Sequence, residues 1–264
     1  RIKVENVQYG LPSDKNAFAV IAYAPYGGGT GKAIGLQKSG NYLVWAPSDT
    51  KGNTTNFIDI QADYNGSSSS GYTFTGDLDG SDNWDYICKI DPEGTLDAAT
   101  NYPVFNFALS YGTTAGLTET DYETGWYVPS VAEVYEVYKN KDVIQTSLDA
   151  AKGFTIGTSD YYCSSQMSYF DDCSYEVYFY SGSIYSCAKK YSDYVFVLQA
   201  FNAEQFNNYK YGTPEITSVE IPAIREGFVG EVPVTIRGKD FNQEITISGL
   251  TISTVDYISD AKAI

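Results

Sequence analysis

The residues with the most distinctive chemistry gather in one interval, residues 160–196. This interval reads DYYCSSQMSYFDDCSYEVYFYSGSIYSCAKKYSDYVF, and it holds nine of the 25 tyrosines and three of the four cysteines. Tyrosine offers a large contact area at a small cost in side-chain entropy, and serine adapts its hydrogen bonds, as in antibody paratopes. The composition therefore predicts a surface that binds another molecule.

Catalysis has little support in the sequence. The chain contains no histidine, which removes the commonest general base and every Ser-His or Cys-His nucleophile pair. The many Asp and Glu residues could serve acid–base chemistry of the glycosidase type, but none lies in a recognisable motif. We expect that the protein is not an enzyme, and a hydrolase remains the less favoured alternative.

The charge balance excludes two classes of partner. The formal net charge is -16, whereas binding to phosphate groups needs clustered Lys and Arg. We therefore expect no nucleic acid and no anionic membrane as a partner. No run approaches the roughly 18 apolar residues of a membrane span, so this fragment is not expected to insert into a membrane.

The cysteines leave two possibilities open. Cys88, Cys163, Cys173 and Cys187 lack the CxxC spacing of a structural zinc site. Cys163 could pair with Cys187 or Cys173 in a disulfide that clamps binding loops. Alternatively, all of these are free thiols, and Cys163 serves as a small hydrophobic residue. The richness in Tyr, Ser, Gly and Asn, with few Lys and Arg, favours an extracellular location.

The first third of the chain predicts strands followed by a loop. The apolar run AFAVIAYA, residues 17–24, and the segment NYLVWAPSD, residues 41–49, have the length and residue types of strands. Residues 50–82 are rich in Gly, Ser, Asn, Asp and Thr, which is typical of a surface loop. We therefore expect this stretch to bury no core.

Two helical segments follow. Pro103 is suited to the first turn of one helix. The other begins with a capping box, in which Ser130 precedes Glu133 by three residues. We expect that Asn140 restarts this helix and that Gly153 ends it. Together these segments predict an α+β domain with two helices, small antiparallel sheets and long loops.

Period-two alternation selects the residues that would contact a ligand. In the strand at residues 176–182, Val177 and Phe179 share the face expected in the core, and Glu176 lies on the other face. In the strand at residues 194–201, Val195 and Val197 lie opposite Tyr194 and Phe196. The loop at residues 167–174 would carry the most accessible groups. The predicted ligand-binding residues are Tyr161, Tyr162, Tyr169, Phe170, Asp171, Asp172, Tyr175, Tyr178, Tyr180, Tyr185, Tyr191, Tyr194 and Phe196.

The order of several motifs resembles a known family. GWYVPSVAEVYEVYKNKDVI is followed some thirty residues later by YYCSS, then EVYFYSG and YVFVLQAF. This order resembles the bacterial C-type-lectin-like domains related to legionella collagen-like adhesins and to the succinogenes major paralogous family. Members read G-W-x-L-P-S-x-x-E-L, then Y-W-S-S, and the match covers most of residues 10–203. The chain departs from the pattern where Cys163 replaces Trp and where Phe196 and Gln199 replace Arg.

This domain type also resembles the variable proteins of diversity-generating retroelements. In those systems template adenines are replaced at random, so that Asn-type codons become any codon ending in a pyrimidine. Tyr, Ser, Cys, Phe and Asp can all arise in this way, and they dominate residues 160–196. The residues of the interval that cannot arise in this way are few: Gln166, Met167, Glu176, Lys189 and Lys190. A binding surface with ordinary Tyr and Ser enrichment, or a core of alternate tyrosines, would explain the same composition.

A calcium site is an alternative for a lectin-like domain. Calcium needs six to eight oxygens, which Asp171, Asp172 and the string DLDGSDNWD at residues 77–85 could supply in part. The E-P-N or Q-P-D and W-N-D signatures of animal C-type lectins are absent, and the string is not an EF-hand loop. We therefore expect a solvated acidic loop and no cofactor, with a structural calcium ion as the alternative.

The two ends of the chain differ in sequence pattern from its central part. Residues 214–264 give short strands every 8–12 residues, the rhythm of an immunoglobulin-like sandwich, which resembles the repeats of bacterial surface stalks. We expect a head at residues 8–210, a truncated immunoglobulin-like module at 214–264, and the end of a preceding module or linker at 1–7. The chain reads as a fragment of something longer.

These observations predict a ligand-binding protein of the bacterial cell surface, an adhesin or a receptor. Its partner would be a protein or a glycan on another cell. A calcium-assisted glycan-binding lectin is the main alternative. The sequence leaves the identity of the ligand and the oligomeric state open.

Overall fold

The computed structural model describes residues 2–5, 17–23, 30–202, 215–220 and 234–239. The chain divides into two compact units. We call Asn16–Ala203 the head, and Arg1–Lys15 together with Glu204–Ile264 the outer unit. Among the described residues, no helix has the length and apolar character needed to cross a membrane.

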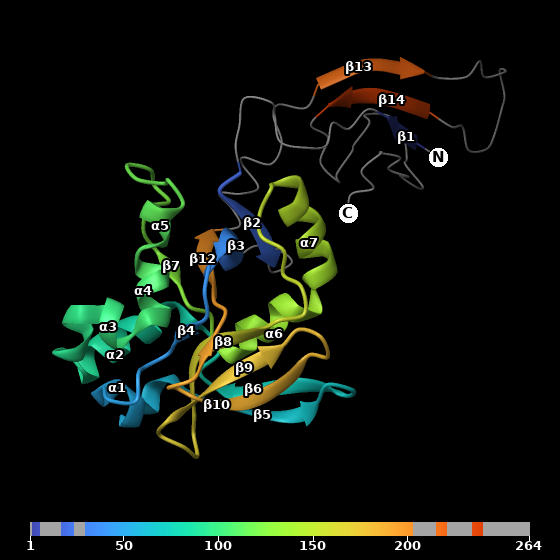
Figure 1. Cartoon of the computed structure of the whole chain (residues 1–264). Coiled ribbons are helices and arrows are strands. Elements are labelled where there is room, and N and C mark those ends of the chain that lie inside the picture. The colour runs from blue at the N-terminus through green and yellow to red at the C-terminus, as the bar shows by residue number, and fades with distance from the viewer. Residues whose placement is uncertain (1, 6–16, 24–29, 203–214, 221–233, 240–264) are drawn as a thin grey trace. The chain divides into compact units, whose positions relative to one another are not determined.

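A five-stranded sheet forms one part of the head, in the order β10-β9-β8-β5-β6 (Figure 1). Its strands pair antiparallel except β5 and β8, which run parallel. A four-stranded sheet has the order β2-β3-β12-β7, and β4 pairs with β11. The strands are β2 (Ala19–Tyr23), β3 (Thr30–Lys38), β4 (Leu43–Val44), β5 (Gln61–Ser67), β6 (Gly71–Gly76), β7 (Trp126–Tyr127), β8 (Asp160–Met167), β9 (Cys173–Tyr178), β10 (Ser183–Ala188), β11 (Ser192–Asp193) and β12 (Phe196–Asn202).

The helices lie in two groups, with α1 to α5 on one side of the head and α6 and α7 on the other (Figure 1). They are α1 (Lys51–Thr54), α2 (Asn83–Ile90), α3 (Ala98–Asn101), α4 (Pro103–Leu109), α5 (Tyr111–Thr114), α6 (Val131–Lys139) and α7 (Lys141–Ala150). Short 3-10 turns occupy Ile58–Ile60, Gly80–Asp82 and Gly94–Asp97. Small sheets combined with helices and without a barrel make the head α+β, as predicted.

The predicted signals of the long helical segment are confirmed. Ser130 Oγ accepts from the backbone N–H of Glu133 at 3.3 Å, and Glu133 Oε2 accepts from the N–H of Ser130 at 3.0 Å. Asn140 separates α6 from α7. The N–H of Gly153 then bonds to the carbonyl of Leu148 at 2.7 Å, which ends the segment. Local chemistry therefore decides where these helices begin and end.

The prediction that residues 50–82 form only a surface loop is wrong. This stretch contains α1 and the hairpin of β5 and β6. The hairpin turns at Gly71, which has the positive φ that glycine tolerates. Tyr64 and Tyr72 pack edge to face at 5.2 Å between ring centroids, and Tyr72 packs in the same way on Tyr135 of α6. Aromatic packing on a helix thus stabilises strands whose composition indicates a loop.

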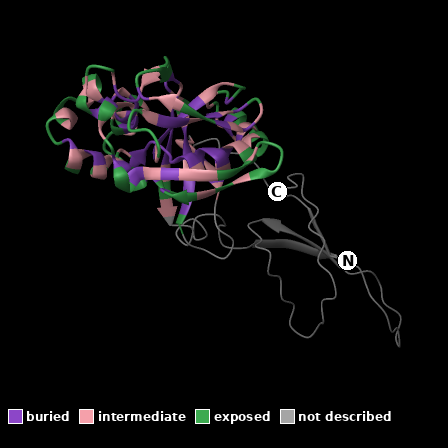
Figure 2. Ribbon diagram, turned by 90° about the horizontal axis from the view of Figure 1, so that it is seen from below, coloured by how far each residue is buried: buried purple, intermediate pink, exposed green. Residues whose placement is uncertain are grey.

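Two hydrophobic clusters fill the head, and buried residues form its interior (Figure 2). One cluster combines α6 and α7 with strands of both larger sheets, and the other includes the residues of α2, α4 and α5. Around β12, Phe196 and Leu198 belong to the first cluster, whereas Val195 and Val197 belong to the second. Successive side chains point to opposite faces of a strand, so β12 is covered on both faces.

The outer unit contains a three-stranded sheet in the order β1-β14-β13. β1 (Ile2–Glu5) pairs parallel with β14 (Val234–Lys239), and β13 (Glu215–Glu220) pairs antiparallel with β14. The residues that we expected to end a preceding module therefore share a sheet with the C-terminal segment. Residues 221–233 and 240–264, which carry much of the predicted immunoglobulin-like module, lie outside the described residues.

Candidate ligand-binding surface

Exposed aromatic side chains concentrate in the interval that the composition singled out. Twelve large hydrophobic side chains are exposed among the described residues, and five of them fall between residues 169 and 191. All five are aromatic, whereas most of the other seven are aliphatic. We call this set the aromatic edge; its members and exposed fractions are Tyr169 (77%), Phe170 (54%), Tyr180 (70%), Tyr185 (49%) and Tyr191 (62%).

The aromatic edge follows β9 and β10. Tyr169 and Phe170 lie in the turn before β9, and Tyr180 lies in the turn after it. Tyr185 is on β10, which is the last strand at this side of the five-stranded sheet, and Tyr191 follows β10. The six residues of β9 span about 20 Å at the usual rise of a strand.

Four of the predicted contact residues are instead core residues. Tyr161, Tyr162, Tyr175 and Phe196 are each at most 1% exposed, so their prediction as contact residues was wrong. Tyr161 donates to the carbonyl of Ile156 at 2.6 Å. The other two hydroxyls also find carbonyl acceptors, in line with the rule that buried polar groups are hydrogen-bonded.

The physical reason is the place of β8 in the sheet. β8 lies between β9 and β5, and both of its faces are covered: Tyr161 belongs to one hydrophobic cluster and Tyr162 to the other. The alternation of side chains along a strand separates its two faces, but it does not show whether the second face is exposed to solvent or covered by another segment. One signal was present, because no charged residue occurs between Asp160 and Asp171.

The remaining predicted residues are at least partly accessible. Asp171 and Asp172 are exposed, and Tyr178 and Tyr194 are half-buried. Tyr178 packs near Tyr180 at 5.8 Å between centroids. Tyr194 packs on exposed Tyr42 at 4.5 Å, a neighbour that the sequence did not predict. The expected core positions of this strand, Val177 and Phe179, are fully buried, which confirms that part of the prediction.

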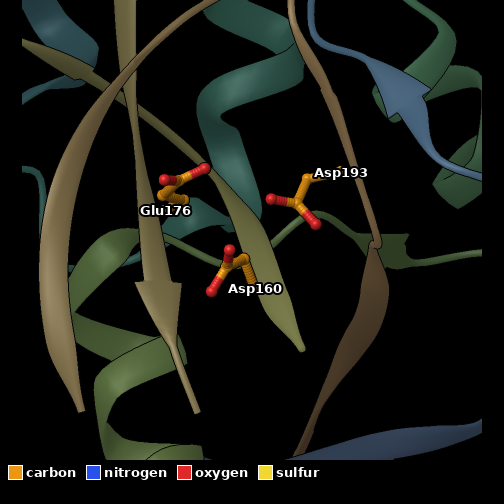
Figure 3. A group of neighbouring side chains, drawn as sticks. All are labelled: Asp160, Glu176 and Asp193. Carbon is orange, nitrogen blue, oxygen red and sulfur yellow. The ribbon is translucent and has the colours of Figure 1, made fainter. Parts of the chain in front are cut away.

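Three carboxylates meet beside the aromatic edge. Asp160 begins β8, Glu176 is on β9 and Asp193 ends β11, and their carboxylates face a common space (Figure 3). Their oxygens lie within 4.8 Å of one another. Strand register places Tyr178 opposite Asp160 and Tyr185 opposite Glu176. The acidic cluster, Asp160, Glu176 and Asp193, therefore adjoins the exposed tyrosines.

Burial and mutual repulsion raise the pKa values of all three carboxyl groups of the acidic cluster. Burial and the charge of Asp193 raise the pKa of Asp160 to about 6. Burial and neighbouring carboxylates likewise raise the pKa of Glu176 and Asp193. Two like charges at about 5 Å repel by about 3 kcal/mol at an effective dielectric constant of about 20, so full ionisation is unfavourable.

A cation could replace those protons. Among the described residues, this cluster is the one group of three or more His, Cys, Asp or Glu side chains close enough to share a metal ion. Asp160 Oδ1 is buried without a hydrogen-bond partner. Calcium takes six to eight oxygen ligands, however, and three carboxylates supply only part of that number. Lys38 lies close enough to interact with Asp193: burial lowers the pKa of the Lys38 ammonium, and the charge of Asp193 opposes this shift.

The acidic string at residues 77–85 is a solvated loop only in part, because Asp79, Asp82 and Asp85 are exposed and Asp77 is not. Asp77 is buried, and it accepts hydrogen bonds from Asn83 at 2.7 Å and from Ser165 at 2.7 Å. Asp79 pairs with the buried Lys32 at 2.9 Å. Burial raises the pKa of Asp77 to about 6, although its hydrogen bonds oppose this shift. Asp77 therefore holds the loop to β8 from a buried position, and the exposed Asp79 ties it to Lys32 of β3.

The four cysteines are free thiols. In the pairing of β9 and β10, Cys187 lies opposite Ser174, and Cys173 lies opposite Ala188. Directly opposed residues share a face, so the two thiols point to opposite faces of the hairpin. Cys163 is fully buried in a hydrophobic cluster, where it acts as the small hydrophobic residue of the second alternative.

Comparisons with known proteins give little guidance. No protein-family model matches the chain, and no curated protein matches it. Among solved structures, the chain is similar to a fimbrial protein from Bacteroides ovatus, with 15% sequence identity and a TM-score of 0.45. The similarity covers 65% of this chain and 36% of the fimbrial protein. The function must therefore be inferred from the site itself.

Proposed function

We propose that this chain is a ligand-binding protein of the bacterial cell surface, with an adhesin or receptor role and a C-type-lectin-like head. The aromatic edge, together with Asp171 and Asp172, would contact a protein or glycan on another cell. The outer unit would contribute an immunoglobulin-like stalk. No residue of this surface is assigned a catalytic role.

The aromatic edge is the observation that carries the proposal. Exposed aromatic rings of this number leave apolar area in water, which is unfavourable unless a partner covers it. Tyr is among the residues most enriched in interface hot spots, because one ring combines apolar area with a hydroxyl that hydrogen-bonds. The adjacent acidic cluster adds polar groups of the kind that fix the orientation of a ligand.

The contact between two motifs supports the lectin-like resemblance. The helix start PSVAE and the strand YYCSS were matched separately along the sequence, and in the structure they touch. The N–H of Val131 donates to Ser165 Oγ at 2.9 Å, and the N–H of Ser164 donates to the carbonyl of Pro129 at 2.8 Å. The residues that carry the resemblance therefore form one structural unit, in which each motif accepts a hydrogen bond from a backbone N–H of the other.

The proposal is tested by binding of the full chain to a glycan array and to a panel of purified extracellular proteins. A variant with Tyr169, Phe170, Tyr185 and Tyr191 changed to Ser should lose at least about tenfold in affinity for any ligand found, since a few hot spots dominate an interface. A matched control changes three exposed aliphatic residues, Ile58, Leu96 and Leu109, to Ser. Equal loss in both variants, or none in the first, would contradict the proposal.

Calcium-assisted glycan binding is the second candidate, and the acidic cluster favours it. In that case EDTA would abolish glycan binding, and Glu176→Gln would have the same effect without EDTA. Binding that persists in EDTA would leave the aromatic edge as the sole basis of recognition. The two candidates thus differ in one measurement on the same chain.

We also propose that the coding sequence of residues 160–196 is diversified by a retroelement. The support is compositional: Tyr, Ser, Cys, Phe and Asp dominate the interval. The genome should then hold a near-copy of this coding DNA beside a reverse transcriptase gene, with differences confined to template adenines. A genome without such a copy would refute diversification and leave the binding proposal intact.

A further inference from the structure

One loop of the aromatic edge is accessible through its side chains and anchored through its backbone. We call residues 168–172, between β8 and β9, the tip loop. Tyr169, Phe170, Asp171 and Asp172 are exposed. Within the described part of the chain, the side chains of the first three make no hydrogen bond, salt bridge or ring-stacking contact. Their removal should therefore cost the fold little.

The backbone of the tip loop is held by Lys189. Lys189 Nζ donates to the carbonyl of Asp171 at 2.6 Å, and the backbone N–H of Lys189 donates to the carbonyl of Asp172 at 2.7 Å. A further bond within the turn joins the N–H of Cys173 to the carbonyl of Phe170 at 3.2 Å. The acceptors are main-chain oxygens, which every residue type provides.

Lys189 is itself fixed in the core of the head. Its side chain is fully buried, and Nζ also donates to the carbonyls of Gly52 at 3.2 Å and Thr55 at 3.0 Å. Gln166 Oε1 accepts from Nζ at 2.9 Å. The rings of Trp45 and Phe57 lie 4.7 and 4.9 Å from the ammonium, within range of cation–π attraction.

Burial of a lysine is costly unless it is fully paired. Burial lowers the pKa of Lys189 to about 7, and the charges of Asp171 and Asp172 oppose this shift. Four oxygen acceptors converge on one nitrogen, which matches an ammonium with three protons better than a neutral amine with two. Such a group is well suited to join distant loops, here the α1 region and the tip loop.

The composition of residues 160–196 agrees with a division between residues that anchor the tip loop and residues that are exposed on it. Gln166 and Lys189 are among the few residues of 160–196 that replacement of template adenines in Asn-type codons cannot produce. Both are fully buried, and they are bonded to each other. Of the tip-loop residues that follow the pattern, Tyr169, Phe170, Asp171 and Asp172 are exposed, whereas Ser168 is half-buried and donates to Asp63 at 2.6 Å. The four exposed side chains at residues 169–172 are thus distinct from Lys189 and Gln166, which lie in the core.

We propose that Lys189 is a positioning residue that holds the backbone of the tip loop while Tyr169, Phe170, Asp171 and Asp172 determine ligand specificity. Only the part of this inference that concerns specificity rests on the proposed binding function; the anchoring by Lys189 does not. Because the hydrogen bonds from Lys189 to the loop go only to main-chain oxygens, exchange of the four side chains changes the recognised chemistry and leaves the loop in place.

The anchor is tested without any ligand, by hydrogen exchange and thermal melting of the full chain. Lys189→Met should speed amide exchange in residues 168–173 by at least about tenfold, because local opening becomes easier. The control is Lys190→Met, at the exposed neighbour, which should change neither exchange nor melting. Unchanged exchange in Lys189→Met would overturn the anchoring role.

A second variant keeps the test decisive if Lys189→Met does not fold. Changing Tyr169 and Phe170 to Ser, and Asp171 and Asp172 to Asn, should leave the melting temperature within about 2 °C of the parent. Exchange in the tip loop should also stay slow. Loss of protection or a larger fall in melting temperature would show that the side chains hold the loop, contrary to the proposal.

Specificity is tested by display of the full chain with residues 169–172 randomised. Selection on hen lysozyme and on streptavidin should yield binders with different tip sequences that do not bind the other probe. The matched library randomises four exposed positions of α7, namely Asp142, Val143, Thr146 and Asp149. Equal success in both libraries, or none in the first, would refute tip-loop specificity. Failure of the natural binding function would appear separately, as an unmodified chain that binds neither glycan nor extracellular protein.

Discussion

β8 and β10 share most of their residue types, but β8 is buried and β10 is partly exposed. β8 reads DYYCSSQM and β10 reads SIYSCA, so both combine Tyr, Ser and Cys. Six consecutive residues of β8 are buried, whereas Tyr185 and Ser186 of β10 are exposed. β8 lies inside the five-stranded sheet, and β10 is its last strand. Position in the sheet, and not residue type, decides whether a tyrosine belongs to the core or to the binding surface.

The largest effect is expected from truncation of a β8 tyrosine. Tyr161→Ala removes a fully buried ring and its hydrogen bond to Ile156, which should lower the free energy of unfolding by about 3–5 kcal/mol. Urea denaturation measures this change. A loss below about 1 kcal/mol would mean that β8 is not the buried strand described here.

A smaller but clear effect is expected from a β8 serine. Ser165 Oγ donates to Asp77 and accepts from the N–H of Val131. Ser165→Ala leaves both buried partners short of a bond, so stability should fall by about 1–3 kcal/mol. The matched control is Ser186→Ala at an exposed position of β10, which should change stability by less than about 0.5 kcal/mol. Similar losses for both serines would remove the contrast between the strands.

The acidic cluster predicts a moderate dependence on pH. The carboxyl pKa values are raised in the folded state, so the folded protein holds more protons than the unfolded chain between about pH 4 and 7. This contribution to stability is full below about pH 4 and is lost as the pH rises through the folded pKa of each group. The buried Asp77, with its raised pKa, acts in the same direction.

The melting temperature should therefore be higher at pH 5 than at pH 7.5, and Asp160→Asn should flatten the profile by at least about 2 °C. Differential scanning calorimetry across this range provides the measurement. Calcium should not shift the melting temperature if shared protons balance the cluster. A calcium-dependent rise in the parent that disappears in Asp160→Asn would instead establish a cation site.

The smallest effect on stability is expected at the aromatic edge. Tyr185→Ala on β10 should change the free energy of unfolding by less than about 1 kcal/mol, because nearly half of this side chain is already in water. Ligand binding should respond more strongly than folding does. A stability loss comparable to that of Tyr161→Ala would place Tyr185 in the core and remove it from the binding surface.

Local signals in the sequence predicted parts of the fold well. The Ser130 and Glu133 capping box, the break at Asn140 and the closure at Gly153 are confirmed, because each depends on hydrogen bonds within a few residues. The burial of Val177 and Phe179 is confirmed for a similar reason, since strand periodicity acts over two residues. Within the loop that we predicted to be accessible, residues 167–174, residues 169–172 are exposed, whereas Ser174 is buried.

Contacts between segments that are distant along the chain could not be predicted from the sequence. The hairpin of β5 and β6 has the composition of a loop, and packing of its tyrosines on α6 makes it a pair of strands. The acidic cluster joins Asp160, Glu176 and Asp193 from three strands, which no local spacing reveals. Lys189 looks like half of an exposed Lys-Lys pair, yet it bonds to oxygens of the α1 region more than 130 residues earlier.

The sequence by itself determined which residue types are available between residues 160 and 196 and how they alternate. It also determined the helix ends, because capping is a local interaction. Only the tertiary structure decided which tyrosines are displayed. Alternation defines two faces of a strand, but the cover of each face comes from segments distant in sequence, and for β8 both faces are covered. The exposed tyrosines of this interval are those of the turns and of the last strand of the sheet, which, among the described residues, no further strand covers.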